Sequence, residues 1–324
     1  MLSVVGPVYN ESASIAEFHS RLVAVLRGMG IPYEIVYVND GSQDSTLDRL
    51  REFSRQDPCV RVLDFSRNFG HQLAITAGMD HAEGSACVIM DTDGQDPPEL
   101  IPRLYESWRA GHEIVYCVRT KREGETWFKK ATAALFYRII RRITNVDIPP
   151  DTGDFRLVDR RVLDVLSDMR EVHRFMRGLT CWTGFKHARV EYSRAGRLAG
   201  TTHYPFWKMV RFALDGITAF SHAPLRWVTF CGLGASVISA VIGVWVLYVK
   251  IFNDQAVRGW TSLMVLVLFM GGMNLIAMGV IGEYLARIFD EVKRRPLYIV
   301  RERIGFGDAR GGSDPAARRE LLRR

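Results

Sequence analysis

Two acidic side chains, Asp91 and Asp93, are separated by one residue and follow the apolar run CVIM. Such a pair can meet one hard divalent cation, because Mg²⁺ and Mn²⁺ prefer oxygen ligands and often share their shell with phosphate oxygens. The run continues through Gln95 and Asp96, and Pro98 suits the first turn of a helix. The sequence therefore predicts a Mg²⁺ or Mn²⁺ site beside a bound phosphate. Asp96 would support that site from behind or simply cap a turn.

Similar polar clusters follow three earlier apolar runs. Any one of them could be an ordinary cap or turn, because Asn, Asp, Gly and Ser are favoured in those places. Four clusters at successive strand ends instead predict one shared site at the carboxyl edge of a sheet. The clusters are Pro7-Val8-Tyr9-Asn10-Glu11, Asn39-Asp40-Gly41-Ser42, Ser66-Arg67-Asn68-Phe69-Gly70 and Asp91-Thr92-Asp93-Gly94-Gln95-Asp96.

The elements that must position these clusters alternate between strand and helix. Short apolar runs predict buried strands, and stretches with apolar residues at helical spacing predict helices. This order favours an α/β fold with a mostly parallel, Rossmann-like sheet. The predicted strands are 2–8, 33–38, 60–65 and 86–90, and the predicted helices are 13–29, 45–56 and 72–81.

Charge is segregated along the 324 residues, whose formal net charge is +7. Residues 1–118 carry −8, residues 119–226 carry +10, residues 227–286 are neutral and residues 287–324 carry +5. The apolar share of 48% excludes a disordered chain. Five cysteines without metal-binding spacing exclude a disulfide scaffold and predict reduced thiols. No nucleic-acid-binding motif accompanies the basic middle.

Two uncharged runs, 227–249 and 259–282, are each long enough to cross a bilayer as a helix. The alternative is a pair of buried core helices. Basic residues before the first run and after the second place residues 1–226 and the basic tail 283–324 in the cytoplasm. Residues 205–226 are predicted to form a juxtamembrane interfacial helix. Residues 127–144 are predicted to form a basic amphipathic helix, either on the membrane or on the domain surface.

The ordered motifs VYNE, VNDGSQDST, SRNFGHQLAITAG, DTDGQDPPEL and DTGDFRLVDRRV resemble those of family 2 glycosyltransferases with the GT-A fold. The chain is more closely similar to polyprenyl-phosphate glycosyltransferases, whose bacterial members resemble dolichol-phosphate mannose synthase. The resemblance covers about residues 1–290. It implies a GT-A catalytic domain over residues 1–204 and two trailing transmembrane helices.

The resemblance also implies a donor site for a nucleotide sugar. Asp40 would contact the base, Arg67 would border the base pocket, and Arg119 would lie near the diphosphate. Asp93 would be catalytic as a metal ligand. The implied nucleotide-sugar-binding residues are Pro7, Tyr9, Asn10, Glu11, Asp40, Arg67, Asp91, Thr92 and Arg119, and the implied metal ligands are Asp91, Asp93 and Gln95.

The implied acceptor side begins at the motif Asp151–Arg156. Asp154 would face the reacting sugar and the acceptor phosphate, where it positions the reactants or acts as a base. Arg156, Arg197 and Thr202 would bind that phosphate. His203 replaces a lysine of the family pattern, so its role stays open between phosphate contact and an interfacial polar group.

The implied reaction is an inverting transfer of one sugar to polyprenyl (undecaprenyl) phosphate at the bacterial cytoplasmic membrane. UDP-glucose is the expected donor, and GDP-mannose is the alternative. The product would serve envelope glycan modification through a separate flippase and a downstream glycosyltransferase, and the enzyme would be a homo-oligomer such as a tetramer. A processive polysaccharide synthase is less favoured, because the Gln of Q-x-x-R-W is absent before Arg226-Trp227. A non-catalytic membrane adaptor is disfavoured by the intact acidic cluster.

Overall fold

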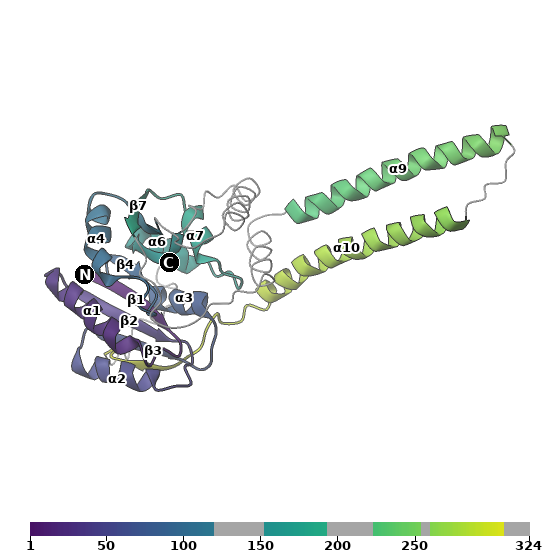
Figure 1. The fold of residues 1–324 in the computed structure, drawn as a ribbon. Helices are drawn as coiled ribbons and strands as arrows, with labels where there is room; N and C mark the ends of the chain where they lie inside the picture. Colours follow the sequence, from purple (N-terminus) through teal and green to yellow (C-terminus); the bar gives the residue numbers. More distant parts are fainter. Residues whose placement is uncertain (120–151, 193–222, 254–259, 308–324) are drawn as a thin grey trace, which may run out of the picture. The chain divides into compact units, whose positions relative to one another are not determined.

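A computed structural model describes residues 1–119, 152–192, 223–253 and 260–307. The chain divides into two compact units. The sheet domain comprises 1–141, 146–204 and 296–324, and the helical unit comprises 142–145 and 205–295. Figure 1 shows the strands of the sheet domain and the helix pair of the second unit.

The sheet domain is built on one eight-stranded sheet with strand order β7-β5-β6-β4-β1-β2-β3-β8. Six strands run in the same direction, and β6 and β8 run against them. The expected mostly parallel α/β fold is therefore confirmed. The strands are β1 (Leu2–Val8), β2 (Tyr33–Asn39), β3 (Val60–Phe65), β4 (Ala86–Ile89), β5 (Ile114–Arg119), β6 (Thr152–Asp159), β7 (His187–Tyr192) and β8 (Val300–Ile304).

Continuous apolar sequence explains the central strands. All seven residues of β1 are buried, as expected for a strand covered on both faces. Helix α1 presents Ile15, Phe18, Leu22 and Leu26 to the core at helical spacing. The helices of this domain are α1 (Ile15–Gly28), α2 (Thr46–Gln56), α3 (His71–His81), the short 3₁₀ turn η1 (Pro98–Leu100), α4 (Ile101–Arg109), α6 (Arg160–Asp168) and α7 (Met176–Trp182).

Strand β8 corrects the sequence-based boundary of a basic tail over residues 283–324. Helix α10 continues to Val292, and residues 300–304 then pair antiparallel with β3 in the sheet. The segment VRERI has three charged residues in five. It forms a strand because edge strands leave one row of side chains and one backbone edge in water, where charges cost little.

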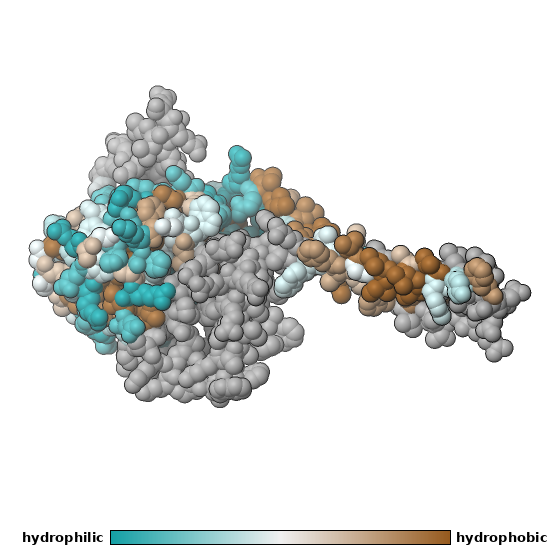
Figure 2. Space-filling view, turned by 90° about the horizontal axis from the view of Figure 1, so that it is seen from above, coloured by the Kyte–Doolittle hydropathy of each residue, from teal (hydrophilic) through white to brown (hydrophobic). Residues whose placement is uncertain are grey.

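The helical unit contains α9 (Ala223–Asn253) and α10 (Trp260–Val292), which include most of the two predicted spans. One stretch, Phe269–Val292, is long and apolar enough to cross a membrane, judged by length and composition. The apolar stretch described in α9 is shorter, Trp227–Ile242. Large apolar side chains such as Phe230 and Leu275 are exposed on these helices, and Figure 2 shows mostly hydrophobic colouring along them.

Candidate active site

The loops after β1 and β2 are tied together by side-chain hydrogen bonds. Asn10 has a left-handed backbone, with φ of 54°. Its N–H donates to Ser42 Oγ at 2.9 Å, and its Oδ1 accepts from the N–H of Gln43 at 2.8 Å. Asp44 accepts from the N–H of Ser12 and from both the N–H and the hydroxyl of Thr46. Although partial burial opposes it, these hydrogen bonds lower the pKa of Asp44 to about 2.

Asp40 joins the second loop to the third. Its carboxylate is buried and accepts from the N–H groups of Phe69, at 2.7 Å, and Gly70, at 3.0 Å. Burial raises its pKa in spite of these bonds. Gly41 has φ of +69°, and a Cβ there would lie 2.5 Å from the backbone of Arg67. Only glycine allows this approach. The structure thus gives Asp40, the expected base contact, a role in holding the third loop.

Tyr9 and Arg67 remain exposed beside these buried ties. Tyr9 is 45% exposed. Arg67 lies over the ring of Phe69, with its guanidinium carbon 4.0 Å from the ring centre, and donates to the Asn68 carbonyl oxygen. Ring and guanidinium faces are surfaces on which a flat base can stack. Both residues stay predicted nucleoside contacts.

Thr92 joins the fourth loop to the first. Its hydroxyl donates to the Pro7 carbonyl oxygen at 2.9 Å, and its side chain is buried. A Cβ on Gly6 would lie 2.9 Å from the methyl carbon of Thr92, so the glycine leaves room for this contact. Thr92 and Pro7, both predicted to line the nucleotide site, therefore hold the loops after β1 and β4 together.

The acidic loop after β4 contains the candidate metal ligands. Asp91 Oδ1 is buried without a hydrogen bond. Burial, followed by the nearby charge of Asp96, raises the pKa of Asp91 to about 6. Asp93 Oδ1 accepts from the N–H of Gln95 at 3.0 Å. Asp96 accepts hydrogen bonds from the Tyr192 hydroxyl at 3.0 Å and from the Asp91 N–H at 3.5 Å, so it ties this loop to β7.

Asp91 and Asp93 supply oxygen ligands of the kind that a divalent cation prefers. The buried Asp91 oxygen without a hydrogen bond, beside a second carboxylate, is a suitable pair of oxygen ligands for Mg²⁺ or Mn²⁺. Among the described residues, no group of three or more His, Cys, Asp and Glu side chains could hold a metal ion. Two carboxylates would therefore need the Gln95 amide, water or substrate phosphate to complete the shell.

Asp154, at the start of β6, is the centre of a buried charge cluster. His71 Nε2 lies 3.3 Å from its Oδ2 and 3.4 Å from Asp91 Oδ1, so this ring stands between the two carboxylates. Arg177 contacts both oxygens of Asp154, at 3.0 and 3.1 Å. Arg156 donates to Oδ1 at 3.0 Å. Burial would raise the pKa of Asp154, but His71, Arg177 and Arg156 together hold it well below its usual range.

The sequence analysis expected Arg156 to bind the acceptor phosphate. The structure instead buries its side chain inside the domain. It is 1% exposed. Its guanidinium donates to the carboxylate and carbonyl oxygens of Asp154, to Thr180 Oγ1 and to the Met176 carbonyl oxygen. Residues 153–158 of β6 are all buried, and α7 covers the face that Arg156 shares with Asp154. It is a structural partner of Asp154.

We expect Arg156→Leu to lower stability rather than acceptor use. Removing one partner from a buried ion pair destabilises by about 3–5 kcal/mol, because the other charges lose compensation. The melting temperature of the detergent-solubilised protein should fall by roughly 5–15 °C. Arg161→Leu is the control, since the Arg161 side chain is 69% exposed and its charge stays hydrated. Equal melting temperatures for the two variants would contradict the structural role.

Three functional candidates escaped the sequence analysis. His71 and Gln72 open α3, and Arg177 lies in α7. Gln72 accepts from the N–H of Met176 at 3.0 Å and approaches Asp154 at 3.5 Å. The HQ pair does follow a strand-end cluster directly, which was a usable signal. Arg177 follows no strand, and only its arginine-rich surroundings could have suggested a phosphate contact.

Several expected site residues cannot be placed. Arg119 ends β5, but its side chain is outside the described part of the structure. Asp151, Arg197, Thr202 and His203 lie outside the described residues, as do residues 127–144 and most of 205–226. Glu11 is described and donates its N–H to Thr46 Oγ1 at 3.0 Å.

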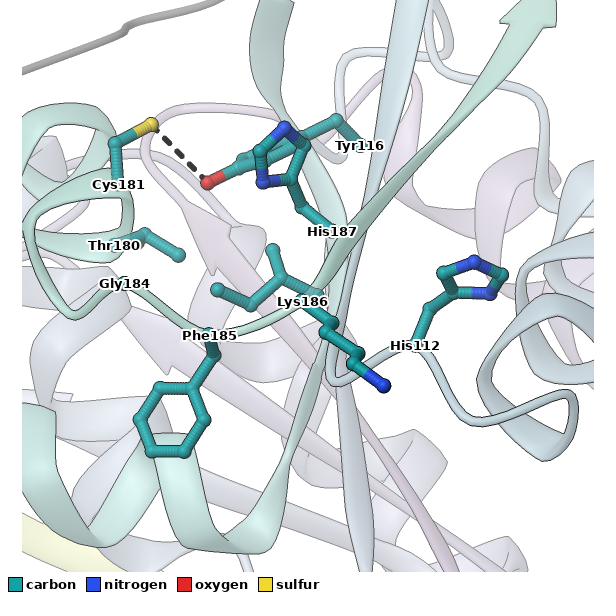
Figure 3. Close-up of a pocket in the computed structure, with 9 residues that line it drawn as sticks. His112, Tyr116, Thr180, Cys181, Gly184, Phe185, Lys186 and His187 are labelled. Atoms are coloured by element: carbon teal, nitrogen blue, oxygen red, sulfur yellow. Dashed lines mark hydrogen bonds between the residues drawn. The ribbon is translucent and has the colours of Figure 1, made fainter.

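A cavity of about 500 Å³ lies elsewhere in the sheet domain. Figure 3 shows Tyr116 joined to Cys181, with His187 beside the tyrosine and the Lys186 amine extended toward His112. The residues from β5 and β7 that line it lie mainly at the amino ends of these strands. The cavity is therefore at the edge opposite the acidic loop, and it is not the candidate donor site.

The strand order and the four polar loops at the carboxyl edge define a GT-A-like α/β domain, the class of fold that many sugar-transferring enzymes use. Residues 3–167 match the family model described as "Glycosyl transferase family 2". The chain belongs to this family and is a glycosyltransferase.

Relatives of similar length support the assignment. The chain is 52% identical over 308 residues to "Uncharacterized glycosyltransferase YkcC" of Bacillus subtilis (strain 168), covering 95% of each chain. It is 41% identical over 301 residues to "Bactoprenol glucosyl transferase" of Shigella phage SfII, covering 93% of this chain and 97% of the relative. The resemblance to polyprenyl-phosphate glycosyltransferases of family 2 is thereby confirmed.

Similarity to solved structures is more distant. A glucosyl-3-phosphoglycerate synthase from Mycobacterium tuberculosis, solved with Mn²⁺ and UDP-glucose, is 18% identical, with a TM-score of 0.46. The match covers 67% of this chain and 77% of that one. A likeness at this level adds nothing to the family assignment.

Proposed function

We propose that this glycosyltransferase moves one sugar, glucose from UDP-glucose, to polyprenyl phosphate at the cytoplasmic face of a bacterial membrane. The observation that carries the proposal is the line of contacts Asp91–His71–Asp154–Arg177, which joins a donor-type acidic loop to the positive charges around Asp154. The relative named bactoprenol glucosyl transferase supports the choice of sugar and lipid. Bactoprenol is a polyprenol, so its phosphate is the corresponding acceptor.

At the donor end, Tyr9 and Arg67 offer faces for the base, while Asp40 and Thr92 keep the loops in place. Asp91, Asp93 and Gln95 would hold Mg²⁺ or Mn²⁺ beside the diphosphate. When bound, the cation would neutralise negative charge on the leaving nucleoside diphosphate. Arg119 ends the strand β5 and would add a second positive charge there.

At the acceptor end, Asp154 positions groups and does not remove a proton. A carboxylate whose pKa is held well below its usual range is a poor base. The acceptor needs little base help, since a phosphate monoester with a second pKa of about 6 is mostly ionised at neutral pH. Asp154 instead orients Arg177 and His71. An acceptor oxygen could then attack the anomeric carbon from the side opposite the leaving diphosphate, inverting that centre.

Arg177 takes the phosphate-binding role that the sequence analysis gave to Arg156. Its side chain is 30% exposed, and its guanidinium is held in a bidentate geometry by Asp154. A guanidinium that a carboxylate holds in one orientation suits the recognition of a phosphate. Arg197 and Thr202 remain further candidates.

The helices complete the proposal. The stretch Phe269–Val292 would cross the membrane, and α9 would supply a second crossing. The sheet domain and the C-terminal end would then share the cytoplasmic side, where basic residues gather. The lipid product would pass to a separate flippase and a downstream glycosyltransferase, and the enzyme would act as a homo-oligomer.

One transfer assay tests this function. Purified protein in detergent receives UDP-glucose or GDP-mannose, Mn²⁺ or Mg²⁺, and undecaprenyl phosphate. Formation of a monoglucosylated lipid from UDP-glucose is the expected result. Mannosylated lipid would correct the donor, a polymer would indicate a processive synthase, and absence of any transfer would overturn the proposal.

We expect Arg177→Ala to weaken use of the lipid acceptor. Loss of a charge-assisted contact to phosphate should raise the acceptor KM by about tenfold or more. The donor KM should change little, because Arg177 lies with Asp154 and not with the base loops. Steady-state kinetics with varied lipid, compared with Arg161→Ala, would check this. A larger rise in the donor KM than in the acceptor KM would contradict the assignment.

A further inference from the structure

The chain that follows α10 returns to the sheet domain and contacts the donor loop. We call residues 296–306 the C-terminal strap and residues 66–70 the donor loop. Within the strap, β8 pairs antiparallel with β3, in a register that matches Val62 with Ile304 and Phe65 with Val300. β3 leads directly into the donor loop, so the strap reaches the site from the open edge of the sheet.

Both backbone groups of Ser66, the first residue of the donor loop, bind the strap. The Ser66 N–H donates to the Ile299 carbonyl oxygen at 3.0 Å, and the Ser66 carbonyl oxygen accepts from Arg301 Nη2 at 2.6 Å. Arg301 also lies 3.9 Å from Asp64 Oδ2, and the other oxygen of Asp64 accepts from Asn39 Nδ2 at 2.7 Å. One exposed arginine thus contacts the entrance to the donor loop and a carboxylate that holds the end of β2.

Aromatic rings continue the contact to the exposed part of the loop. The Tyr298 ring stacks on Phe65 with centroids 5.3 Å apart and an interplanar angle of 14°. Phe65 meets Phe69 edge to face at 5.5 Å, and the Arg67 guanidinium lies over Phe69. Such ring contacts favour defined orientations. The strap is therefore connected to Arg67 by a chain of packed side chains, in which Phe65 is buried and Phe69 is half-buried.

Tyr298 also holds the far end of α3. Its hydroxyl donates to Asp80 Oδ2 at 2.7 Å, and Arg170 contacts both oxygens of the same carboxylate, at 2.7 and 2.8 Å. Helix α3 carries His71 at its other end. Tyr298 consequently contacts both elements that flank the donor loop, β3 before it and α3 after it.

We propose that the C-terminal strap positions the donor loop, with Arg301 and Tyr298 as positioning residues for nucleotide binding. The proposal rests on the proposed function, since it assumes that the donor loop borders the base of a nucleotide sugar. Neither residue contacts the reacting atoms. Their effect is to restrict the donor loop to the conformation that presents Arg67, so that less order has to be gained when the nucleotide binds.

The chain offers a matched pair for the test. Arg301 and Arg303 are two residues apart on β8, and both are exposed. Arg303 pairs in register with Leu63, inside the strand, whereas Arg301 reaches Ser66. Arg301→Ala and Arg303→Ala therefore remove the same charge from the same strand. The two variants are compared by calorimetry, which measures UDP binding to the full-length protein in detergent with Mn²⁺ present.

We expect Arg301→Ala to raise the dissociation constant of UDP by on the order of threefold to tenfold, the effect of one charge-assisted hydrogen bond. Arg303→Ala should stay within about twofold of wild type. The acceptor KM should not change in either variant. Equal UDP affinities for the two variants would overturn the strap proposal while leaving sugar transfer intact. Failure of the wild-type protein to bind UDP or GDP would overturn the proposed function and the strap proposal together.

Tyr298 supplies a second comparison that separates positioning from folding. Tyr298→Phe keeps the ring stack and loses the bond to Asp80, whereas Tyr298→Leu loses both. We expect Tyr298→Phe to bind UDP more tightly than Tyr298→Leu, because the phenylalanine ring still stacks on Phe65. Melting temperatures identify a general loss of folding. UDP affinity equal to wild type in folded Tyr298→Leu would overturn the role of the stack.

Discussion

Asp93→Asn is expected to reduce sugar transfer by about a thousandfold or more, because a neutral amide is a far weaker ligand than a carboxylate for the proposed cation. Folding should survive the change. Asp93 is half-buried, and its Oδ1 accepts a hydrogen bond from the Gln95 N–H. An asparagine oxygen can accept the same bond. The loss should appear in kcat and should not be restored by more lipid.

Metal titrations would locate the cause of that loss. Wild-type protein should need Mn²⁺ or Mg²⁺ for UDP binding, and Asp93→Asn should bind the ion at least about tenfold more weakly. Burial raises the pKa of Asp91 to about 6, above its ordinary value, so protons compete with the cation below that pH. Apparent metal affinity should therefore fall as pH is lowered through about 6. The control is Asp48→Asn, whose carboxylate is 78% exposed on α2. Transfer by Asp93→Asn at the control rate would contradict the metal assignment.

Asp154→Asn is expected to cause the second large loss, on the order of a hundredfold to ten-thousandfold in kcat/KM. An asparagine keeps the size of the side chain but leaves Arg156 and Arg177 without their shared negative charge. The buried Arg156 would then be poorly compensated, and Arg177 would lose the partner that orients it. Both stability and acceptor use should fall together.

The pH dependence of stability would test the same cluster. The native pKa of Asp154 is depressed, so its contribution to stability is fully present above the unfolded value near 4 and is lost as pH falls below it. Wild-type melting temperatures should drop more steeply below about pH 4 than those of Asp154→Asn. A rate step between about pH 5 and 8 that disappears in Asp154→Asn would instead make this residue the base.

The strand-end clusters explain why much of the fold was predictable. Buried parallel strands have continuous apolar runs, and the loops that follow them need Asn, Asp and Gly for turns, so β1 to β4 were visible from local sequence. The same rule predicted that Asp91, Thr92 and Asp93 lie together at the carboxyl edge of the sheet. Asp40 and Thr92 took bracing roles because their side chains turn toward buried backbone groups, which no spacing rule reveals.

The remaining features depend on contacts between distant segments. Arg156 was assigned to a phosphate because arginine at a functional motif usually faces a ligand, whereas full burial is decided by α7, which covers β6 from elsewhere in the chain. Arg177 belongs to the site only because α7 packs there. Strand β8 has too many charges for a hydrophobic signal, and its partner β3 lies more than 230 residues earlier in the chain.

The edge position of β8 has a consequence for biosynthesis. Ribosomes make chains from the N-terminus, and domains generally begin to fold during synthesis. The backbone edge of β3 can gain its antiparallel neighbour only after α9 and α10 have been translated. Until then it is an open strand edge, the kind of surface on which nascent chains associate. Completion of the sheet domain therefore follows synthesis of α9 and α10, and a transcript truncated after α10 should yield aggregating protein.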